Sequence, residues 1–320
     1  MNVLSIVIPL FNERRSLAPL AAQLGLALDG LGGESEILFV DDGSSDGSLE
    51  ALRALADVDA RVRVLRLRTH NGKAAALAAG FAAARGDVVV TMDADLQDDP
   101  AELPRFVAAI DAGFDLVSGR KRLRRDRRGK VVASRLFNAV VRRVFGVPLH
   151  DVNCGYKAYR RELIEQLHPY GELHRFIPVF AQGLGARIGE IDVRHSPRRH
   201  GASKYGGTRL PKALLDLLTV LLLTRYRDRP LHFFAVLALS GAGAAALLCI
   251  AALGLDRLGV VHLSGVWLAA LAGVIVVLMG QCLVAGLLAE QRRAASPPHN
   301  AALCEEYTPV ARPARRVSHG

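Results

Sequence analysis

The sequence predicts an α/β fold: a doubly wound, Rossmann-like domain followed by interfacial amphipathic helices and two C-terminal transmembrane helices. Short apolar segments alternate with helix-like segments over the first 120 residues, which is typical of a parallel sheet covered by helices. Two aspartates directly follow one of these segments, where ligands bind in such sheets. Near the C-terminus, residues 230–255 and 258–289 lack charges, and both stretches exceed the roughly 20 residues that cross a bilayer.

The first strand is expected at residues 4–10 and the first helix at residues 17–28, where leucine and alanine recur at helical spacing. The turn between them, residues 9–13, contains no glycine. A dinucleotide-binding turn needs glycines there so that its backbone can approach a pyrophosphate. The turn therefore argues against an NAD enzyme.

The second strand, at residues 36–40, runs into an acidic loop at residues 41–48 that precedes a helix at residues 49–56. Asp41 and Asp42 are candidates for accepting hydrogen bonds from a base or a ribose. The alternative is an ordinary turn that caps the helix, since Asp and Ser are common in both places.

A third strand at residues 62–67 is followed by an alanine-rich helix at residues 74–84. A phosphate-binding P-loop would need glycine at the position of Leu67 and serine or threonine at the position of Ala74. The sequence therefore excludes a P-loop. Lys73 still stands at a helix start, where exposed N–H groups favour a phosphate.

The fourth strand, at residues 88–90, leads to Asp93, Asp95 and Gln97. Side chains alternate along an extended chain, so the two carboxylates project to one side. Such a pair suits Mg²⁺ or Mn²⁺, which prefer oxygen ligands, and Gln97 adds a neutral oxygen. The alternative is a solvated acidic turn before a helix that starts near Pro100.

Four motifs occur in order: Pro9-x-Phe11-Asn12-Glu13, Asp41-Asp42-Gly43-Ser44, Asn71-Gly72-Lys73 and Asp93-Ala94-Asp95-Leu96-Gln97-Asp98-x-Pro100. This set resembles family 2 inverting glycosyltransferases of glycosyltransferase-A fold, and within them the branch of dolichol-phosphate mannosyltransferases and bacterial polyprenyl-phosphate hexosyltransferases. The resemblance implies that the base and ribose of a nucleotide sugar are bound by Pro9, Phe11, Glu13, Asp41 and Asp42, and that a metal on the diphosphate is held by Asp93, Asp95 and Gln97. Lys73 and Asp93 complete the residues expected to bind the nucleotide.

A fifth strand at residues 116–119 opens a run rich in arginine and lysine, followed by apolar residues at helical spacing over residues 131–146. This predicts an interfacial helix beside a basic loop that binds a lipid phosphate. Arg120 and Arg127 are the candidates for that acceptor phosphate. The alternative is a solvated basic loop.

Two later segments complete the expected site. The resemblance places Asp151 near the reacting centre, although a phosphate-monoester acceptor is already anionic at neutral pH and needs no general base. A further strand is expected at residues 190–194. The resemblance implies that the basic loop after it contacts the diphosphate, and the alternative is a basic surface loop. The candidates in this loop are Arg199, His200, Ser203 and Lys204.

The predicted organisation is a catalytic domain at residues 1–209, a second interfacial helix at 210–229, a two-helix transmembrane hairpin at 230–289 and a disordered basic tail at 290–320. Arginines flank the hairpin on one side, so the positive-inside rule places the catalytic domain and both termini in the cytoplasm. The formal net charge of +10 also favours anionic partners, including anionic membrane lipid.

The function predicted from these features is inverting transfer of a hexosyl group from a UDP- or GDP-linked sugar to undecaprenyl or dolichyl phosphate at the cytoplasmic membrane face. Basic stretches without interleaved aromatic residues argue against nucleic acid, and homo-oligomerisation is left open. Two alternatives remain: a membrane-anchored nucleotide-sugar sensor or scaffold without turnover, and a polysaccharide synthase.

Overall fold

The structure, a computed structural model, describes residues 3–121, 128–167, 169–196, 209–226 and 304–307, with scattered positions between 241 and 291. The chain divides into two compact units. One unit comprises Met1–Arg209 and Pro298–Gly320, and the other comprises Leu210–Pro297.

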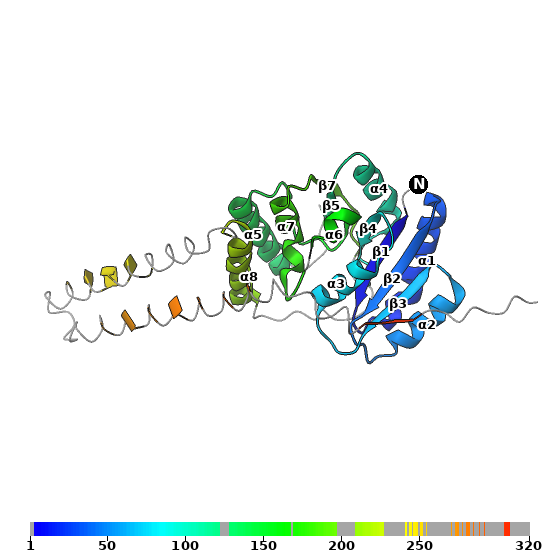
Figure 1. The fold of residues 1–320 in the computed structure, drawn as a ribbon, viewed down its shortest axis with the longest axis horizontal. Coiled ribbons are helices and arrows are strands. Elements are labelled where there is room, and N and C mark those ends of the chain that lie inside the picture. The colour runs from blue at the N-terminus through cyan, green and yellow to red at the C-terminus, as the bar shows by residue number, and fades with distance from the viewer. Residues whose placement is uncertain are drawn as a thin grey trace, which may run out of the picture. The chain divides into compact units, whose positions relative to one another are not determined.

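The first unit is built on one mixed sheet (Figure 1). Its strands are β1 Leu4–Leu10, β2 Ser35–Asp41, β3 Val62–Leu67, β4 Val88–Thr91, β5 Leu116–Arg120, β6 Lys157–Arg160, β7 Ile188–Asp192 and β8 Cys304–Tyr307. Their order across the sheet is β7-β5-β6-β4-β1-β2-β3-β8. The strands β4, β1, β2 and β3 are parallel, so their carboxyl ends meet at one edge.

Strand β6 departs from the expected doubly wound order. It lies between β4 and β5 and runs antiparallel to both. The four residues of β6 include Lys157 and Arg160, and this polar content hid the strand in the sequence. Two further differences are that β7 begins and ends two residues earlier than expected, and that part of the tail expected to be disordered forms β8, antiparallel to β3.

Helices cover both faces of the sheet. They are α1 Arg14–Leu31, α2 Ser48–Val58, α3 Lys73–Ala83, α4 Leu103–Asp111, α5 Arg128–Phe145, α6 Arg161–Ile164 and α7 Ile177–Gly183, with 3-10 helices η1 Pro100–Glu102 and η2 Leu173–Phe176. Alternation along the strands feeds two cores: Ile6 and Ile8 of β1 pack with α1, α2 and α4, whereas Val7 packs with α3, α6 and α7. This packing fixes the sheet edge that carries the polar loops.

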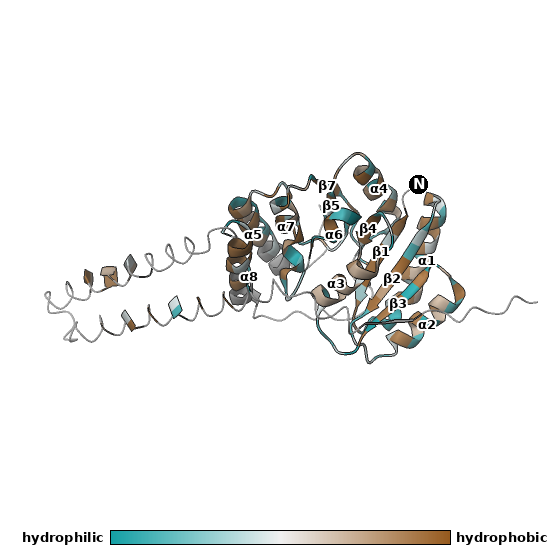
Figure 2. Cartoon of the chain, in the orientation of Figure 1, coloured by the Kyte–Doolittle hydropathy of each residue, from teal (hydrophilic) through white to brown (hydrophobic). Residues whose placement is uncertain are grey.

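The second unit contains α8, Arg209–Thr224. Most of its length is hydrophobic (Figure 2). Val220 and Leu222 are buried, and Leu222 packs with Leu218, Leu221 and Tyr226. No helix among the described residues is long and apolar enough to cross a membrane. The two spans expected over residues 230–289 fall mostly outside the described residues, so they stay a prediction.

Candidate active site

Polar loops at the carboxyl ends of β1, β2 and β4 enclose a pocket of about 270 Å³. Ligands bind at this edge in open α/β sheets because the loops there diverge. Its lining includes Pro9, Phe11, Glu13, Asp42, His70, Lys73, Asp93, Asp95 and Glu172. Six residues expected to bind a nucleotide and the metal candidate Asp95 therefore share one pocket, hereafter the nucleotide pocket.

The two aspartates after β4 present their carboxylates to this pocket in different ways. Asp93 pairs with Lys73, and its side chain is one-third exposed (33%). Burial favours the neutral acid, but the charges of Lys73 and Lys121 outweigh it and hold the pKa of Asp93 below its ordinary range. Asp95 is buried, and its Oδ1 accepts a hydrogen bond from the Gln97 backbone N–H at 3.2 Å.

A strained residue shapes this loop. Leu96 adopts a φ of 62°, in the left-handed region that non-glycine residues rarely occupy. Its side chain is buried in the core, and this burial offsets the backbone cost. Strained conformations of this kind concentrate at functional sites. Here the conformation turns the chain between Asp95 and Gln97.

The pair Asp93 and Asp95 fits a hard divalent cation, because two carboxylates line one pocket with room for phosphate oxygens and water. Among the described residues, no group of three or more His, Cys, Asp or Glu is arranged to hold a metal. A cation here would take its other ligands from substrate and water. The third expected ligand, Gln97, does not line the pocket; its Nε2 donates to the Ser196 carbonyl at 3.3 Å.

The acidic loop after β2 is hydrogen-bonded to the loop that precedes α3. Both carboxylate oxygens of Asp42 accept backbone N–H groups, from Asn71 and Gly72, each at 2.8 Å. Burial raises the pKa of Asp42 in spite of these bonds and the nearby His70. Asp41 is fully buried, accepts from the Ser44 N–H at 3.0 Å and does not line the pocket. Asp41 therefore stabilises the conformation of the acidic loop and does not face the pocket.

An aromatic pair stands at the wall of the nucleotide pocket. The rings of Phe11 and His70 stack, with centroids 3.9 Å apart and planes inclined by 22°, and the Oδ2 of Asp42 lies 2.8 Å from the Nδ1 of His70. Flat rings offer a stacking surface to any base. Sequence reasoning missed His70 because the strand pairing that brings it to Phe11 is not visible in the chain order.

A second cavity of about 140 Å³ adjoins the nucleotide pocket, and Lys73 and Asp93 line both. Its other polar lining comes from Lys157 at the start of β6 and from His174 and Arg175 in η2. We call it the cationic cavity. Sequence reasoning missed all three of these residues, because β6 and η2 reach the cavity only through tertiary packing and carry no local pattern that predicts it.

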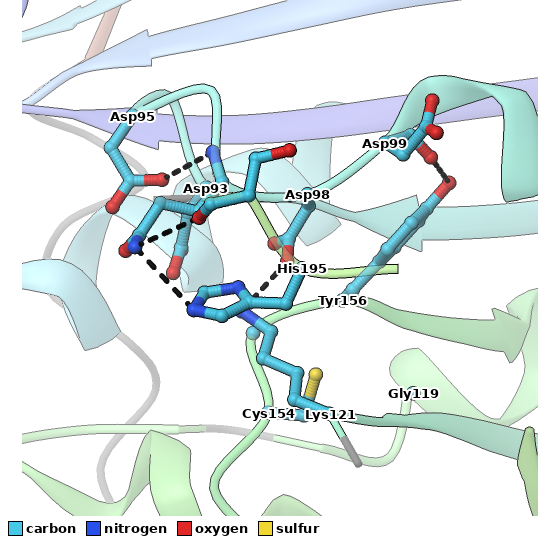
Figure 3. A network of polar contacts seen from close by, with 12 residues as sticks. Asp93, Asp95, Asp98, Asp99, Gly119, Lys121, Cys154, Tyr156 and His195 are labelled. Carbon is cyan, nitrogen blue, oxygen red and sulfur yellow. Dashed lines mark hydrogen bonds and ion pairs between the residues drawn. The ribbon is translucent and has the colours of Figure 1, made fainter. Parts of the chain in front are cut away.

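The loop from Asp93 to Asp99, hereafter the aspartate loop, takes part in a buried ion pair (Figure 3). The Nζ of Lys121 lies 2.7 Å from the Oδ1 of Asp98, and their side chains are 11% and 0% exposed. The Asp98 carboxylate outweighs burial and raises the pKa of Lys121. On the other side of the loop, the Tyr156 hydroxyl donates to the Asp99 carbonyl at 3.3 Å, and an isolated bridge joins Asp98 to His195.

Several expected site residues lie away from both cavities. Asp151 is buried, and its Oδ1 accepts from the Asn138 side chain at 3.3 Å. The Nε of Arg120 lies 3.8 Å from the Oδ1 of Asp192. Neither Asp151 nor Arg120 lines the nucleotide pocket or the cationic cavity. The remaining candidates lie outside the described residues: Arg127, Arg199, His200, Ser203 and Lys204.

Comparisons with known proteins agree with this geometry. The profile of glycosyl transferase family 2 matches residues 5–168. Dodecaprenyl-phosphate galacturonate synthase of Rhizobium johnstonii is 38% identical over 90% of this chain and 86% of its own. Undecaprenyl-phosphate 4-deoxy-4-formamido-L-arabinose transferase of Edwardsiella ictaluri is 40% identical over 78% of this chain and 77% of its own.

Solved structures show a similar fold. Glucosyl-3-phosphoglycerate synthase of Mycobacterium tuberculosis, in complex with UDP, is 26% identical with a TM-score of 0.50, covering 69% of this chain and 79% of that one. The same enzyme with Mn²⁺, UDP and glucosyl-3-phosphoglycerate gives 24% identity and a TM-score of 0.53, covering 70% and 80%. These likenesses support an α/β fold of glycosyltransferase-A type.

Proposed function

This chain belongs to glycosyl transferase family 2, and from that premise we propose that it transfers a sugar from a nucleotide sugar to a polyprenyl phosphate. Its relatives are named as transferases that use dodecaprenyl or undecaprenyl phosphate. The enzyme is thus a polyprenyl-phosphate glycosyltransferase. The donor is left open by these relatives, since one is named for an acidic sugar and the other for a formamido sugar.

The observation that carries the proposal is the nucleotide pocket itself. An aromatic stack, the carboxylates of Asp93 and Asp95, and a lysine meet in one pocket of about 270 Å³. A base, a metal-bound diphosphate and a cationic contact to that diphosphate account for each of these features. In this assignment Phe11 and His70 contact the base, and Lys73 contacts the diphosphate.

The metal is assigned to Asp93 and Asp95. A bound Mg²⁺ or Mn²⁺ would offset negative charge on the diphosphate as it leaves. Lys73 lies beside Asp93 and adds positive charge at the same place. Because the pKa of Asp93 is lowered, its carboxylate is ionised at neutral pH and ready to coordinate a cation.

The chemical step is an in-line displacement at the anomeric carbon. An acceptor phosphate oxygen forms the new bond to that carbon while the bond to the diphosphate oxygen breaks, so the configuration inverts and the nucleoside diphosphate leaves. A phosphate monoester has a second pKa of about 6, so the acceptor arrives as an anion. Asp151, hydrogen-bonded to Asn138, is assigned to positioning rather than to proton removal.

The lipid acceptor is assigned to the membrane side of the domain. Helix α5 exposes Leu136 (61%) and Val140 (38%), one turn apart, together with the exposed residues Arg142 and Arg143. An exposed apolar pair flanked by arginines suits the boundary of an anionic bilayer. Arg120 and Arg127 are retained as acceptor-phosphate candidates, and the spans over 230–289 as the anchor that places the domain on the cytoplasmic face.

The remaining candidates concern the diphosphate. The backbone at Ser196 donates to the Gln97 carbonyl at 2.9 Å, so the segment that leads to Arg199, His200, Ser203 and Lys204 starts at the aspartate loop. We assign these four residues to the diphosphate on that basis. Gln97 is retained as a metal ligand only as a secondary assignment, because its amide contacts Ser196.

The test is transfer of radiolabelled sugar from a panel of UDP and GDP donors to undecaprenyl phosphate by the purified full-length protein with Mg²⁺ or Mn²⁺. Asp95→Asn keeps the shape of a buried side chain and removes its charge, and Asp111→Asn makes the same change at an exposed position. We expect metal-dependent labelling that falls on the order of 100-fold in Asp95→Asn alone. Nucleotide binding without labelling from any donor would instead favour the sensor.

A further inference from the structure

The cationic cavity holds more positive than negative charge. Lys73, Lys157 and Arg175 line it, and Asp93 is the only carboxylate in its lining. Asp93 is already paired with Lys73, and Arg175 with Glu172 at 2.7 Å. The surplus charge therefore resides on Lys157.

Lys157 is buried (4% exposed) in β6, and its ammonium donates to the Cys154 carbonyl. The described residues place no carboxylate within ion-pair distance of it. Burying an ammonium is costly, and burial lowers the pKa of Lys157, although the carboxylates of Asp151 and Asp93, which form no ion pair with it among the described residues, act in the opposite direction. The neighbouring Cys154 thiol supplies no charge, because burial raises its pKa to about 11.

His174 supplies a second unmet polar atom. Its Nδ1 is buried and finds no hydrogen-bond partner in the part of the chain that the structure describes. Burial and the charges of Lys73 and Arg175 lower the pKa of His174 well below its ordinary value, so the ring is neutral and keeps one donor. Both Lys157 and His174 therefore have hydrogen-bonding capacity for a bound anion.

The position of the cavity identifies what reaches it. Asp93 and Lys73, assigned to the metal and the diphosphate, line the nucleotide pocket on one side and the cationic cavity on the other. A sugar attached to the far phosphate of the donor lies beyond these two residues. The cavity of about 140 Å³ is therefore placed to receive the donor sugar.

We propose that the cationic cavity is the donor-sugar subsite and that Lys157, His174 and Arg175 recognise a carboxylate on the sugar ring, so that the donor is a nucleoside diphosphate uronic acid. The proposal rests on the proposed transferase function and names its donor class.

A phosphate on the lipid acceptor would offer the same oxyanion chemistry, but the walls favour the donor. The cavity is floored by Thr91 and Tyr159 of the sheet and bounded by Leu77 and Ile177. A phosphate attached to a prenyl chain must keep that chain in the bilayer, whereas a sugar carboxylate carries no such tether.

The experiment compares matched donors that differ at one carbon. Titration of the full-length protein with Mn²⁺ and without acceptor measures the Kd of UDP-galacturonate against UDP-galactose, UDP-glucuronate against UDP-glucose, and GDP-mannuronate against GDP-mannose. UDP and GDP alone report the nucleotide pocket. The variants are Lys157→Met, which keeps the length of the side chain, and Arg85→Met, which removes one exposed charge far from the cavity.

We expect the wild type and Arg85→Met to bind one uronate donor at least about tenfold more tightly than its neutral partner, as a charge-assisted hydrogen bond requires. Lys157→Met should abolish this preference and leave the Kd of the free nucleotide unchanged. His174→Asn should reduce the ratio between the Kd values of the neutral and the uronate donor. This milder change tests the same cavity should Lys157→Met fail to fold.

Equal binding of acidic and neutral donors by the wild type would overturn the proposal, as would a preference that survives in Lys157→Met. If Lys157→Met instead raises the KM for undecaprenyl phosphate with donor preference unchanged, the cavity binds the acceptor phosphate and the uronate proposal fails. Because donor binding is measured without acceptor, a uronate preference without lipid labelling would defeat the transferase function alone.

Discussion

The ion pair between Lys121 and Asp98 should be worth several kcal/mol to the fold. Its atoms lie 2.7 Å apart, and the side chains are 11% and 0% exposed. Lys121→Met would leave the Asp98 carboxylate buried, and the described residues offer its oxygens no hydrogen-bond partner other than Lys121. Removing one member of a buried pair costs about 3–5 kcal/mol, which corresponds to a fall in Tm of roughly 6–20 °C for a domain of this size.

The surface pair Arg61 and Asp29 provides a matched control. Its separation is also 2.7 Å, but its side chains are 31% and 66% exposed. Asp29→Asn should therefore cost less than about 1 kcal/mol. Both variants are compared with the wild type by thermal unfolding of the purified full-length protein. Equal and small shifts in Tm would refute the reasoning, because it predicts a much larger loss for the buried pair than for the exposed one.

The Asp98 carboxylate outweighs burial and raises the pKa of Lys121. The pair's contribution to stability should therefore persist as pH rises through the ordinary titration range of a lysine, as thermal unfolding at pH 7 and pH 10 would show. Lys121→Met with Asp98→Asn should recover most of the loss, since no buried charge remains.

Three further changes test other parts of the structure. Gly80→Ala should lower the free energy of unfolding by about 1–3 kcal/mol, because its Cβ would lie 2.3 Å from the side chain of Val7 in β1. Gly30→Ala meets nothing within 4 Å and should raise the free energy of unfolding by up to about 1 kcal/mol. Urea unfolding measures both changes. Burial raises the pKa of the Cys154 thiol to about 11, so this thiol should resist iodoacetamide at pH 8 in the folded protein and react with it in urea. Peptide mass spectrometry measures the labelling. Fast labelling of the folded protein would contradict the burial of Cys154. Gly155→Ala would place a Cβ 2.7 Å from the Asp93 Oδ2. The variant should slow sugar transfer to undecaprenyl phosphate by about tenfold or more with little change in Tm. An unchanged initial rate would contradict the proposed role of Asp93.

The sequence predicted the parts of the fold that local patterns encode. The parallel strands β1 to β4 are runs of apolar residues with polar loops at their ends, and each was expected within one residue of its observed bounds. Strand β6 escaped because its four residues include Lys157 and Arg160, and its pairing with β4 joins residues more than 60 positions apart. Local patterns carry no information on such a pairing.

The same contrast between local patterns and long-range packing applies to the candidate active site. Motifs at strand ends predicted the residues of the nucleotide pocket, since the carboxyl ends of parallel strands necessarily meet. The cationic cavity depends on β6 and η2, which approach the aspartate loop only through tertiary packing, so Lys157, His174 and Arg175 left no local pattern. Asp151 and Arg120 were chosen from a motif and a charge run, and the structure brings neither to the two cavities.

The pairing of β4 with β6 also bears on how this enzyme could change its donor. Lys157 stands opposite Thr91 in the antiparallel register, two residues before Asp93. Neighbouring strands lie about 4.8 Å apart, so the backbone ladder, and not a loop, sets the spacing between residue 157 and the carboxylates that we propose hold the metal. A substitution at 157 would alter the charge offered to the sugar and leave the diphosphate site in place. Selection for new donors could therefore begin with libraries at positions 157, 174 and 175.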